Sequence, residues 1–378
     1  MRGEPRLRRA HVALALTFVA FGVVDGSWSA RLPALKQRLS LDSGELGLVA
    51  FALTGAATAV LPLAGFLASR FGTRAPAALG LFVASGALAA AAFAPGEASL
   101  AAAAAGIGAG FGVVDVAANA HGVVLERRLG RHVLSALHGM WSLGLLAGSG
   151  IGAGAAAAAV GIRGQFPAVA AAVAALAVLV VPQLLRAEDA GAARFALPRG
   201  EAALPALLMF CSMFVESATM SWSAVFLAGP AHASGAVAAA GIVAFSVAMA
   251  LSRFVGDRLL ARWGVAGLAQ RGGAVACLGI GVALAARTPA AGLAGFALVG
   301  AGSAVLVPAI FRVAGSSSRT SAAAGIAAVA TAGYTGGVIN GPAIGFLARG
   351  VGLTGALGLV GAAALVIALL GSRLVSTP

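Results

Sequence analysis

Long apolar stretches alternate with short polar segments along the whole chain, and each stretch is long enough to cross a bilayer as a helix. A transmembrane helix needs about 20 predominantly apolar residues. The first six stretches lie near 11–30, 45–69, 75–94, 99–124, 133–159 and 166–185, and six more lie near 202–228, 235–256, 267–286, 290–311, 321–347 and 353–371. The pattern therefore predicts an all-α membrane protein with twelve transmembrane helices.

The polar positions between these stretches repeat at an offset of about 192 residues. The motif SWSA at 27–30 returns at 221–224, and GAG at 108–110 returns at 300–302. Ordered matches at one offset indicate two copies of one unit, and many secondary transporters place their substrate site where such copies face each other. We expect two pseudo-symmetric six-helix bundles, 1–186 and 201–378, joined by a cytoplasmic linker at 187–200.

Composition agrees with a membrane protein, because 60% of the residues are hydrophobic, 10% are charged and the mean hydropathy is +0.98. Such values exclude an ordinary soluble domain. The net charge of +13 is distributed unevenly: nineteen of the 25 basic residues fall in the N-terminal tail, the even-numbered loops and the C-terminus. Basic residues concentrate on the cytoplasmic side, so we expect both termini in the cytoplasm of a bacterial cell whose inner membrane holds the protein.

The sequence argues against several other classes of function. No basic patch interleaved with aromatic residues is present, so nucleic-acid binding is not expected. Cys211 and Cys277 lie in different spans without the spacing of metal ligands, and no pair of nucleophile and base indicates an enzyme. We expect no cofactor and no metal, and a monomer whose partners are a small-molecule substrate, protons and membrane lipid.

Seven polar or ionisable side chains fall deep inside the predicted spans, where such groups are costly and usually functional. Three of them are acids, and the others are amides, an imidazole and the single tyrosine. The seven residues are Asp25, Asp115, Asn119, His138, Glu216, Tyr334 and Asn340.

In the fourth span two of these residues share a helical face with three glycines. Gly108, Gly112, Asp115, Asn119 and Gly122 follow a spacing that places them on one stripe of a helix. We expect the glycines to leave room into which the carboxylate and the amide project.

No lysine or arginine lies in the middle of a predicted span, because Arg253 and Arg312 fall at cytoplasmic ends. An anionic substrate would need a buried base, so a neutral ligand is expected. Flat indole faces beside amide groups suit a sugar or another small polyhydroxy compound. Trp28, Trp141 and Trp222 could supply them, although a tryptophan near the end of a span also serves as an interfacial anchor.

The segment after the second span, GFLASRFGTR at 65–74, resembles the loop motif G-x-L-A-D-R-x-G-R-R of the major facilitator superfamily. Ser69 replaces the acidic member of that motif, whereas the second copy at 256–264 keeps an acid as Asp257. The resemblance implies the twelve-helix fold of that superfamily and an ionic latch at the cytoplasmic face. The expected gating residues are Arg70, Arg74, Asp257, Arg258 and Arg262.

Asp115–Asn119, which reads DVAAN, resembles an acid-x-Ala-Ala-Asn element in the fourth span of the fucose-permease branch of that superfamily. The branch has Glu where this chain has Asp115 and Pro where it has Ala120. The resemblance implies that Asp115 is the principal proton-coupling carboxylate and that Asp25, in the first span, is its partner. The alternative is that Asp115 and Asn119 only form hydrogen bonds with neighbouring helices.

These observations predict a secondary active transporter that moves a small neutral, sugar-like solute together with protons by alternating access. The expected substrate-binding residues are Trp28, Asn119, His138, Trp141, Glu216, Trp222, Tyr334 and Asn340.

A second hypothesis is proton-driven efflux of drugs or lipophilic cations, which unpaired acids would favour. The segment 337–345, GVINGPAIG, resembles the Gly-x-x-x-Gly-Pro-x-x-Gly element of drug antiporters. That element belongs in the fifth span, however, and here it falls in the eleventh. A sensor or scaffold that transports nothing is a third hypothesis, and the acid–Asn pair inside the fourth span argues against it.

Overall fold

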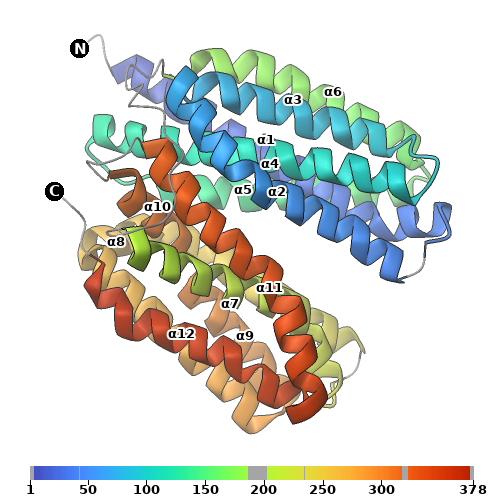
Figure 1. Ribbon diagram of the computed structural model, residues 1–378, viewed down its shortest axis with the longest axis vertical. Coiled ribbons are helices and arrows are strands. Elements are labelled where there is room, and N and C mark those ends of the chain that lie inside the picture. The colour runs from blue at the N-terminus through green and yellow to red at the C-terminus, as the bar shows by residue number, and fades with distance from the viewer. Residues whose placement is uncertain (1–3, 42, 186–201, 234, 317–321, 375–378) are drawn as a thin grey trace. The chain divides into compact units, whose positions relative to one another are not determined.

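The computed structural model describes residues 4–41, 43–185, 202–233, 235–316 and 322–374, and its described residues are almost entirely helical (Figure 1). The first half contains α1 Glu4–Arg38, α2 Ser43–Phe71, α3 Arg74–Ala91, α4 Glu97–Leu129, α5 Leu134–Ala157 and α6 Ile162–Val180, followed by a 3-10 turn, Val181–Gln183. The second half contains α7 Ala203–Ala228, α8 Gly235–Ala286, α9 Pro289–Ser303, α10 Leu306–Ser316, α11 Ala322–Ala356 and α12 Gly358–Leu370, followed by the 3-10 turn Gly371–Arg373.

Among the described residues, ten helical segments are long and apolar enough to cross a membrane, with α9 and α10 together forming one of them. One of the ten, in α8, contains two spans, because Gly264 inside it has φ 66° and ψ 174° and reverses the chain. The residues of α11 beyond Gly352, which has φ 72°, continue into α12 and complete the last span. The twelve predicted spans are therefore all found.

The chain forms two compact units. The first comprises Met1–Val133, Leu137–Leu197 and Ser317–Thr331, and the second comprises Leu134–Ala136, Pro198–Ser316 and Ala332–Pro378. Each unit therefore holds most of one sequence repeat together with the beginning of the fifth helix of the other repeat. The expected linker at 187–200 lies outside the described residues.

Helix packing inside the two units follows the sequence repeat. A Cβ atom added to Gly80 of α3 would lie 2.7 Å from the carbonyl oxygen of Gly110 in α4. One added to Gly272 of α8 would lie 2.5 Å from the carbonyl oxygen of Gly302 in α9. Both members of the second pair are offset from the first by 192 positions, so the repeat seen in the sequence is also a repeat of backbone contacts.

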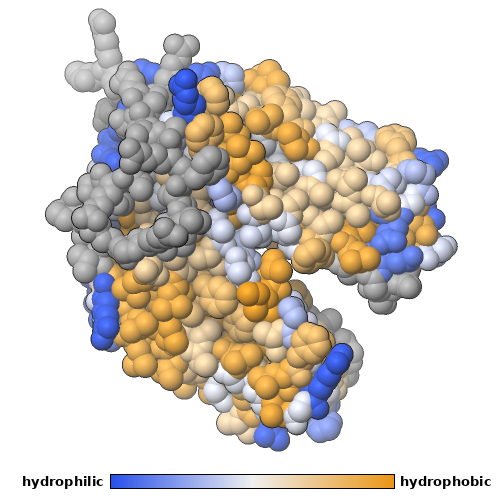
Figure 2. All heavy atoms as spheres, viewed as in Figure 1, coloured by the Kyte–Doolittle hydropathy of each residue, from blue (hydrophilic) through white to orange (hydrophobic). Residues whose placement is uncertain are grey.

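The flanks of many helices expose large apolar side chains. Phe51 of α2 is 62% exposed, Leu179 near the end of α6 is 67% exposed and Phe346 of α11 is 67% exposed. Figure 2 shows hydrophobic colouring over helix flanks and hydrophilic colouring gathered near helix ends. Apolar side chains on the helix flanks are suited to contact with the hydrocarbon of a bilayer. The backbone polar groups are hydrogen-bonded within the helices and need no water there. The chain is therefore an integral membrane protein.

Within the first unit, α1 and α5 approach each other closely enough for their backbones to touch. A Cβ atom on Gly26 would lie 2.7 Å from the backbone nitrogen of Ser149, and one on Gly148 would lie 2.9 Å from that of Ser27. The hydroxyl of Ser27 donates a hydrogen bond to the Gly148 carbonyl at 3.3 Å. Small residues four apart allow such close approach in membranes. This contact fixes the two helices that carry Asp25 and His138.

Candidate functional site

The fourth helix is central to the first unit and holds Asp115 and Asn119 in its buried part. Their exposed fractions are 6% and 0%. The glycines of the expected stripe have a different role from the predicted one: a Cβ on Gly112 would lie 2.6 Å from the Ala57 carbonyl oxygen, and Gly108 faces the backbone of Leu53 as closely. These two glycines allow the backbone of α2 to pack directly against α4, and no open space is left beside them. The expectation that they open room for the polar side chains was wrong.

Three side chains of the predicted site form a chain of hydrogen bonds in the first unit. The Asn119 Nδ2 group donates to Asp115 Oδ1 at 2.9 Å and to the Asp115 backbone carbonyl at 2.9 Å. On its other side, the Asn119 Oδ1 atom lies 2.9 Å from His138 Nε2. The His138 ring packs against Phe18 of α1, with centroids 5.4 Å apart. An acid, an amide and an imidazole are thus brought together from α4 and α5.

Asp25 lies half-buried on α1 beside the contact with α5. Its carboxylate accepts a hydrogen bond from the Ser29 hydroxyl one turn later, at 3.5 Å. The adjacent Gly26 packs against α5, so the Asp25 backbone is held by the close contact described above. A role for Asp25 in proton coupling stays a prediction.

The two tryptophans of the first unit have different surroundings. Trp28 is only 3% exposed and packs against Phe166 of α6, with centroids 6.4 Å apart. Trp141 on α5 is half-buried and lies near Phe21, with centroids 6.1 Å apart. The packing of Trp28 favours a structural role, and substrate contact by either ring stays a prediction.

In the second unit, Glu216 of α7 forms a buried ion pair with Arg253 of α8. Arg253 Nη2 lies 3.5 Å from Glu216 Oε1, and the two residues are 3% and 8% exposed. From the sequence, Arg253 was expected at a cytoplasmic helix end, and no base was expected in the interior. That expectation was wrong, because the long side chain reaches the acid of a neighbouring helix. Because the buried arginine has a carboxylate partner within the protein, the pair carries no net charge.

Arg253 also forms a hydrogen bond with the backbone at the break between α9 and α10. Pro308 has no N–H group and therefore cannot donate to the carbonyl of Ala304, four residues earlier. Arg253 Nε donates to that carbonyl at 3.3 Å. The guanidinium thus satisfies a backbone group that the proline leaves without a helical donor. This contact was not foreseen from the sequence, although the position of Pro308 inside an apolar run was the available signal.

The other predicted residues of the second unit lie on α7 and α11. Asn340 is 5% exposed, and its Nδ2 group donates to the Gly337 carbonyl one turn earlier. The Trp222 ring lies against Gly345 of α11, where an added Cβ would be 3.8 Å from it. Among the described residues, neither Trp222 Nε1 nor Asn340 Oδ1 has a hydrogen-bond partner, and both atoms are buried. Tyr334 is half-buried on the same helix.

Of the expected gating residues, Asp257 has the most extensive contacts. Its two carboxylate oxygens accept hydrogen bonds from the backbone N–H groups of Ser135 and Ala136, at 3.2 and 2.9 Å. Both donors lie in the first turn of α5, within Leu134–Ala136, the part of α5 that belongs to the second unit. A carboxylate is favourable at a helix N-terminus. Arg312 of α10 lies 3.8 Å from the same carboxylate, a partner that the sequence analysis did not assign to it.

The arginines of the loop motifs are less constrained. Arg70 lies 5.7 Å from the ring centroid of Phe71, and Arg258 and Arg262 are exposed. Within the described part of the chain no ion pair involves these three residues or Arg74. The Ser69 hydroxyl, at the position of the motif's missing acid, donates to the Gly65 carbonyl of its own helix at 2.7 Å. A gating role for the arginines stays a prediction.

Two buried groups near the end of α4 were missed by the sequence analysis. The His121 Nδ1 atom lies 2.8 Å from the Thr73 hydroxyl, and its Nε2 atom accepts from the Leu185 backbone N–H at 3.3 Å. Glu126 accepts from the Val133 backbone N–H at 2.7 Å. These contacts tie the ends of neighbouring helices together and do not extend to Asp115.

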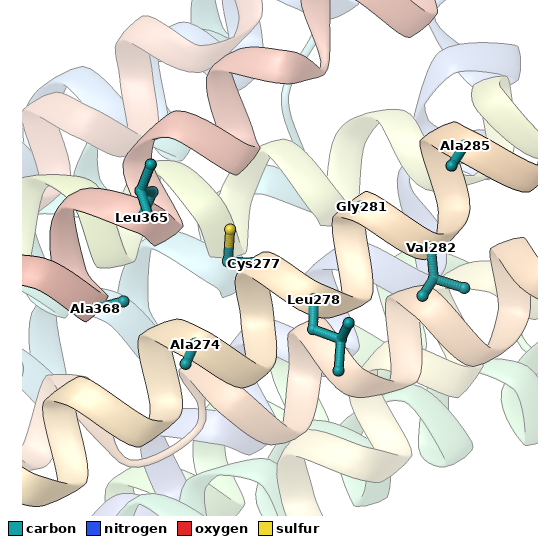
Figure 3. Close-up of a pocket in the computed structure, with 8 residues that line it drawn as sticks. All are labelled: Ala274, Cys277, Leu278, Gly281, Val282, Ala285, Leu365 and Ala368. Atoms are coloured by element: carbon teal, nitrogen blue, oxygen red, sulfur yellow. The ribbon is translucent and has the colours of Figure 1, made fainter.

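An apolar groove of about 580 Å³ lies on the second unit between α8 and α12. Figure 3 shows Cys277, Leu278 and Val282 of α8 facing it, with Leu365 and Ala368 from α12. Its side chains are apolar apart from the Cys277 thiol, so it offers no hydrogen-bonding groups suited to a polyhydroxy ligand.

Comparison with known proteins identifies relatives over nearly the full length. No family model matches the chain. It is 31% identical to an uncharacterised MFS-type transporter of Yersinia pestis, over 94% of both chains. It is also 31% identical to the membrane protein MosC of Rhizobium meliloti, over 97% of this chain and 90% of that protein.

A solved structure of the Escherichia coli fucose:proton symporter FucP has the same fold. It superposes with a TM-score of 0.82 over 97% of this chain and 98% of that one, at 18% identity. The twelve spans, the repeat and these relatives agree. The chain belongs to the major facilitator superfamily of transporters.

Proposed function

We propose that this transporter moves a small neutral, sugar-like solute across the bacterial inner membrane by proton-coupled alternating access, with both termini in the cytoplasm. The observation that carries the proposal is the hydrogen-bonded set Asp115, Asn119 and His138 inside the first unit. Ionisable groups inside a membrane protein are costly and mark proton or substrate pathways. Asp115 is the principal coupling carboxylate, and Asp25 on α1 is its partner.

A neutral ligand is supported by the charges of the second unit. The buried base Arg253 has Glu216 as its carboxylate partner, so an anionic substrate would have to displace that carboxylate. The buried Trp222 Nε1 donor and the buried Asn340 Oδ1 acceptor have no hydrogen-bond partner among the described residues. A ligand hydroxyl can accept a hydrogen bond from such a donor and donate one to such an acceptor. The structural likeness to a fucose:proton symporter supports the same class of substrate.

Efflux of lipophilic cations is the second candidate, and the structure weakens its main argument. That hypothesis relied on several unpaired acids, and Glu216 is paired with Arg253. The remaining acids would serve a symporter equally well.

The first experiment identifies the ligand. Purified protein is screened by thermal shift against sugars, nucleosides and cationic drugs, since a ligand that binds the folded state raises the apparent stability. Stabilisation by neutral polyhydroxy compounds is expected, followed by uptake of the hit into proteoliposomes under an imposed pH gradient. Stabilisation by cationic drugs alone would overturn the proposal in favour of efflux.

A further inference from the structure

The apolar groove of the second unit follows one face of the second span within α8 (Figure 3). Ala274, Leu278, Gly281 and Ala285 line it, and all four residues are exposed. Their spacing of four, three and four residues places them on one stripe of the helix. From Ala274 to Ala285 the helix rises about 16 Å, close to half of the roughly 30 Å hydrocarbon core of a bilayer. The groove therefore has the depth of one leaflet.

α12 forms the other wall of the groove and runs antiparallel to this part of α8. A Cβ atom added to Gly273 would lie 2.5 Å from the Ala368 backbone nitrogen, whereas one added to Gly361 would lie 3.5 Å from Ile280 Cγ2. The Cys277 thiol donates a hydrogen bond to the Gly361 carbonyl at 3.8 Å. Because the two helices are in direct contact, the groove is a fixed part of the folded second unit.

The groove is suited to a hydrocarbon chain. Leu278 is 61% exposed and Leu365 is 47% exposed, so its rim presents apolar side chains to the surroundings. A Cβ atom added to Gly281 would have no atom within 4 Å, so this glycine leaves space between the side chains. Covering such a surface with hydrocarbon is favourable, and the chain is an integral membrane protein that is surrounded by acyl chains.

One end of the groove carries a positive charge. Arg271 is exposed and precedes Ala274 by three residues, which places it on the same helical face as the groove. Its guanidinium carbon lies 4.7 Å from the ring centroid of Trp263, and a Cβ atom added to Gly267 would lie 3.0 Å from its Nη1 atom. The side chain therefore points back along α8, away from the apolar groove. Tryptophan and arginine are typical of the interface where lipid headgroups lie.

The positive charge at this end has no acidic neighbour among the described residues. A Cβ atom added to Gly371 would lie 2.8 Å from Ala269 Cβ, so Arg373, two residues later, is at the same end of the helix pair. No acidic residue follows Asp257 in the sequence, and no described ion pair involves Arg271 or Arg373. Arginine binds phosphate through strong, charge-assisted hydrogen bonds. This end of the groove is therefore complementary to an anionic headgroup.

We propose that the groove between α8 and α12 binds one acyl chain of an anionic phospholipid, whose phosphate is bound by Arg271. The apolar walls alone would accept a chain from any lipid, and the arginine selects a negatively charged one. With the orientation proposed above, the lipid belongs to the cytoplasmic leaflet. The site contains none of the residues proposed for solute binding or proton coupling, so it does not depend on the transported solute.

Native mass spectrometry of the full-length protein in detergent tests the site. The probes are phosphatidylglycerol, which is anionic, and phosphatidylethanolamine with identical acyl chains, which has no net charge. The wild type should retain one phosphatidylglycerol about tenfold more tightly than phosphatidylethanolamine, as expected for a hydrogen bond to a charged group. Equal retention of the two lipids would overturn the proposal.

Two pairs of variants test the two parts of the site. Gly281→Leu fills the groove and should abolish retention, whereas Gly86→Leu in α3, another exposed position with nothing within 4 Å of a Cβ atom, should not. Arg271→Gln should lose most of the preference for phosphatidylglycerol. Arg287→Gln, which removes an exposed arginine beyond the other end of the groove, is its matched control and should keep the preference.

The Cys277 thiol reports occupancy of the groove directly, which keeps the test decisive should Gly281→Leu fail to fold. In a Cys211→Ser background, phosphatidylglycerol should slow the alkylation of Cys277 by N-ethylmaleimide, and phosphatidylethanolamine at the same concentration should have a smaller effect. Equal retention in Gly281→Leu and Gly86→Leu would overturn the proposal, as would a loss of preference in Arg287→Gln alone. A wild-type dimer that Gly281→Leu dissociates would overturn it in favour of a second copy of the chain in the groove.

Discussion

Glu216 and Arg253 form an ion pair 3.5 Å long in the interior of the second unit, although they are 37 positions apart in the sequence. Arg253 is held from its other side by the Ala304 carbonyl that Pro308 leaves without a helical donor. Breaking a buried pair by removing one partner typically costs about 3–5 kcal/mol, whereas replacing both partners with apolar groups costs far less.

We therefore expect Glu216→Gln to lower the thermal stability of the purified protein strongly, because Arg253 is left as an unpaired buried charge. The double variant Glu216→Gln with Arg253→Met should regain most of the loss. Thermal unfolding of both single variants and the double variant gives the coupling energy through a double-mutant cycle. Additive losses would show that the pair is not coupled.

The contact between α1 and α5 predicts a sharp difference between two neighbouring glycines. Gly148 faces α1, where a Cβ would lie 2.9 Å from the Ser27 nitrogen, whereas nothing lies within 4 Å of a Cβ at Gly150. Gly148→Ala should destabilise the protein by about 1–3 kcal/mol through overpacking. Gly150→Ala is the control and should be neutral or stabilising by about 1 kcal/mol, given the helix propensities. Equal thermal stability of the two variants would contradict the close contact.

Asn340 should contribute to ligand binding through its buried, unpartnered Oδ1 atom. Asn340→Ala is expected to weaken binding of the best neutral hit from the thermal-shift screen about tenfold, which corresponds to one hydrogen bond of roughly 1.4 kcal/mol. Ile339→Ala is a suitable control, because Ile339 is the preceding residue and its side chain is 41% exposed. Isothermal titration of both variants measures the difference. Unchanged affinity in Asn340→Ala, with normal folding, would remove Asn340 from the site.

The uneven distribution of basic residues predicts the orientation of the chain. In a background with Cys211 and Cys277 replaced by serine, a cysteine introduced at Gly191 should react with a membrane-impermeant maleimide only after the cells are lysed. Pro95, in the loop between α3 and α4, lies three predicted spans before Gly191 and therefore on the opposite side, and a cysteine there should react in intact cells. The reverse labelling pattern would invert the topology.

The twelve spans and the repeat could be predicted from the sequence because they depend on local properties. Apolar run length sets where a helix can cross the bilayer, and Gly264 and Gly352 mark the turns between adjacent helices. The break at Ala304–Val305 is signalled in the sequence by Pro308, whereas the contact of Arg253 with the Ala304 carbonyl depends on how α8 packs and could not be predicted.

The candidate site was predictable as a set of residue types and less so as a set of contacts. Asp115 and Asn119 share a helix, so their hydrogen bond follows from a spacing of four. The bond from His138 to Asn119 depends on how α5 packs against α4. The reach of Arg253 to Glu216 depends on a side-chain conformation that no sequence spacing sets. The glycines of α4 were misinterpreted because close helix packing and an open cavity both favour glycine.

The central claim is that protonation of Asp115 couples solute movement to the proton gradient. One proton moving with the solute supplies about 2.3 kcal/mol per 100 mV, enough for roughly fiftyfold accumulation. Asp115→Asn mimics the protonated side chain and should preserve solute binding and exchange while abolishing accumulation. Glu97→Gln, which removes the acid at the first residue of α4, is the matched control and should accumulate solute normally.

The most direct measurement is uptake of the screened ligand into proteoliposomes, with lumenal pH followed at the same time. The account predicts that wild-type protein concentrates the ligand and acidifies the lumen, and that Asp115→Asn exchanges the ligand across the membrane without concentrating it. An Asp115→Asn protein that still accumulates the ligand against its gradient would contradict the account and move the coupling site to another residue.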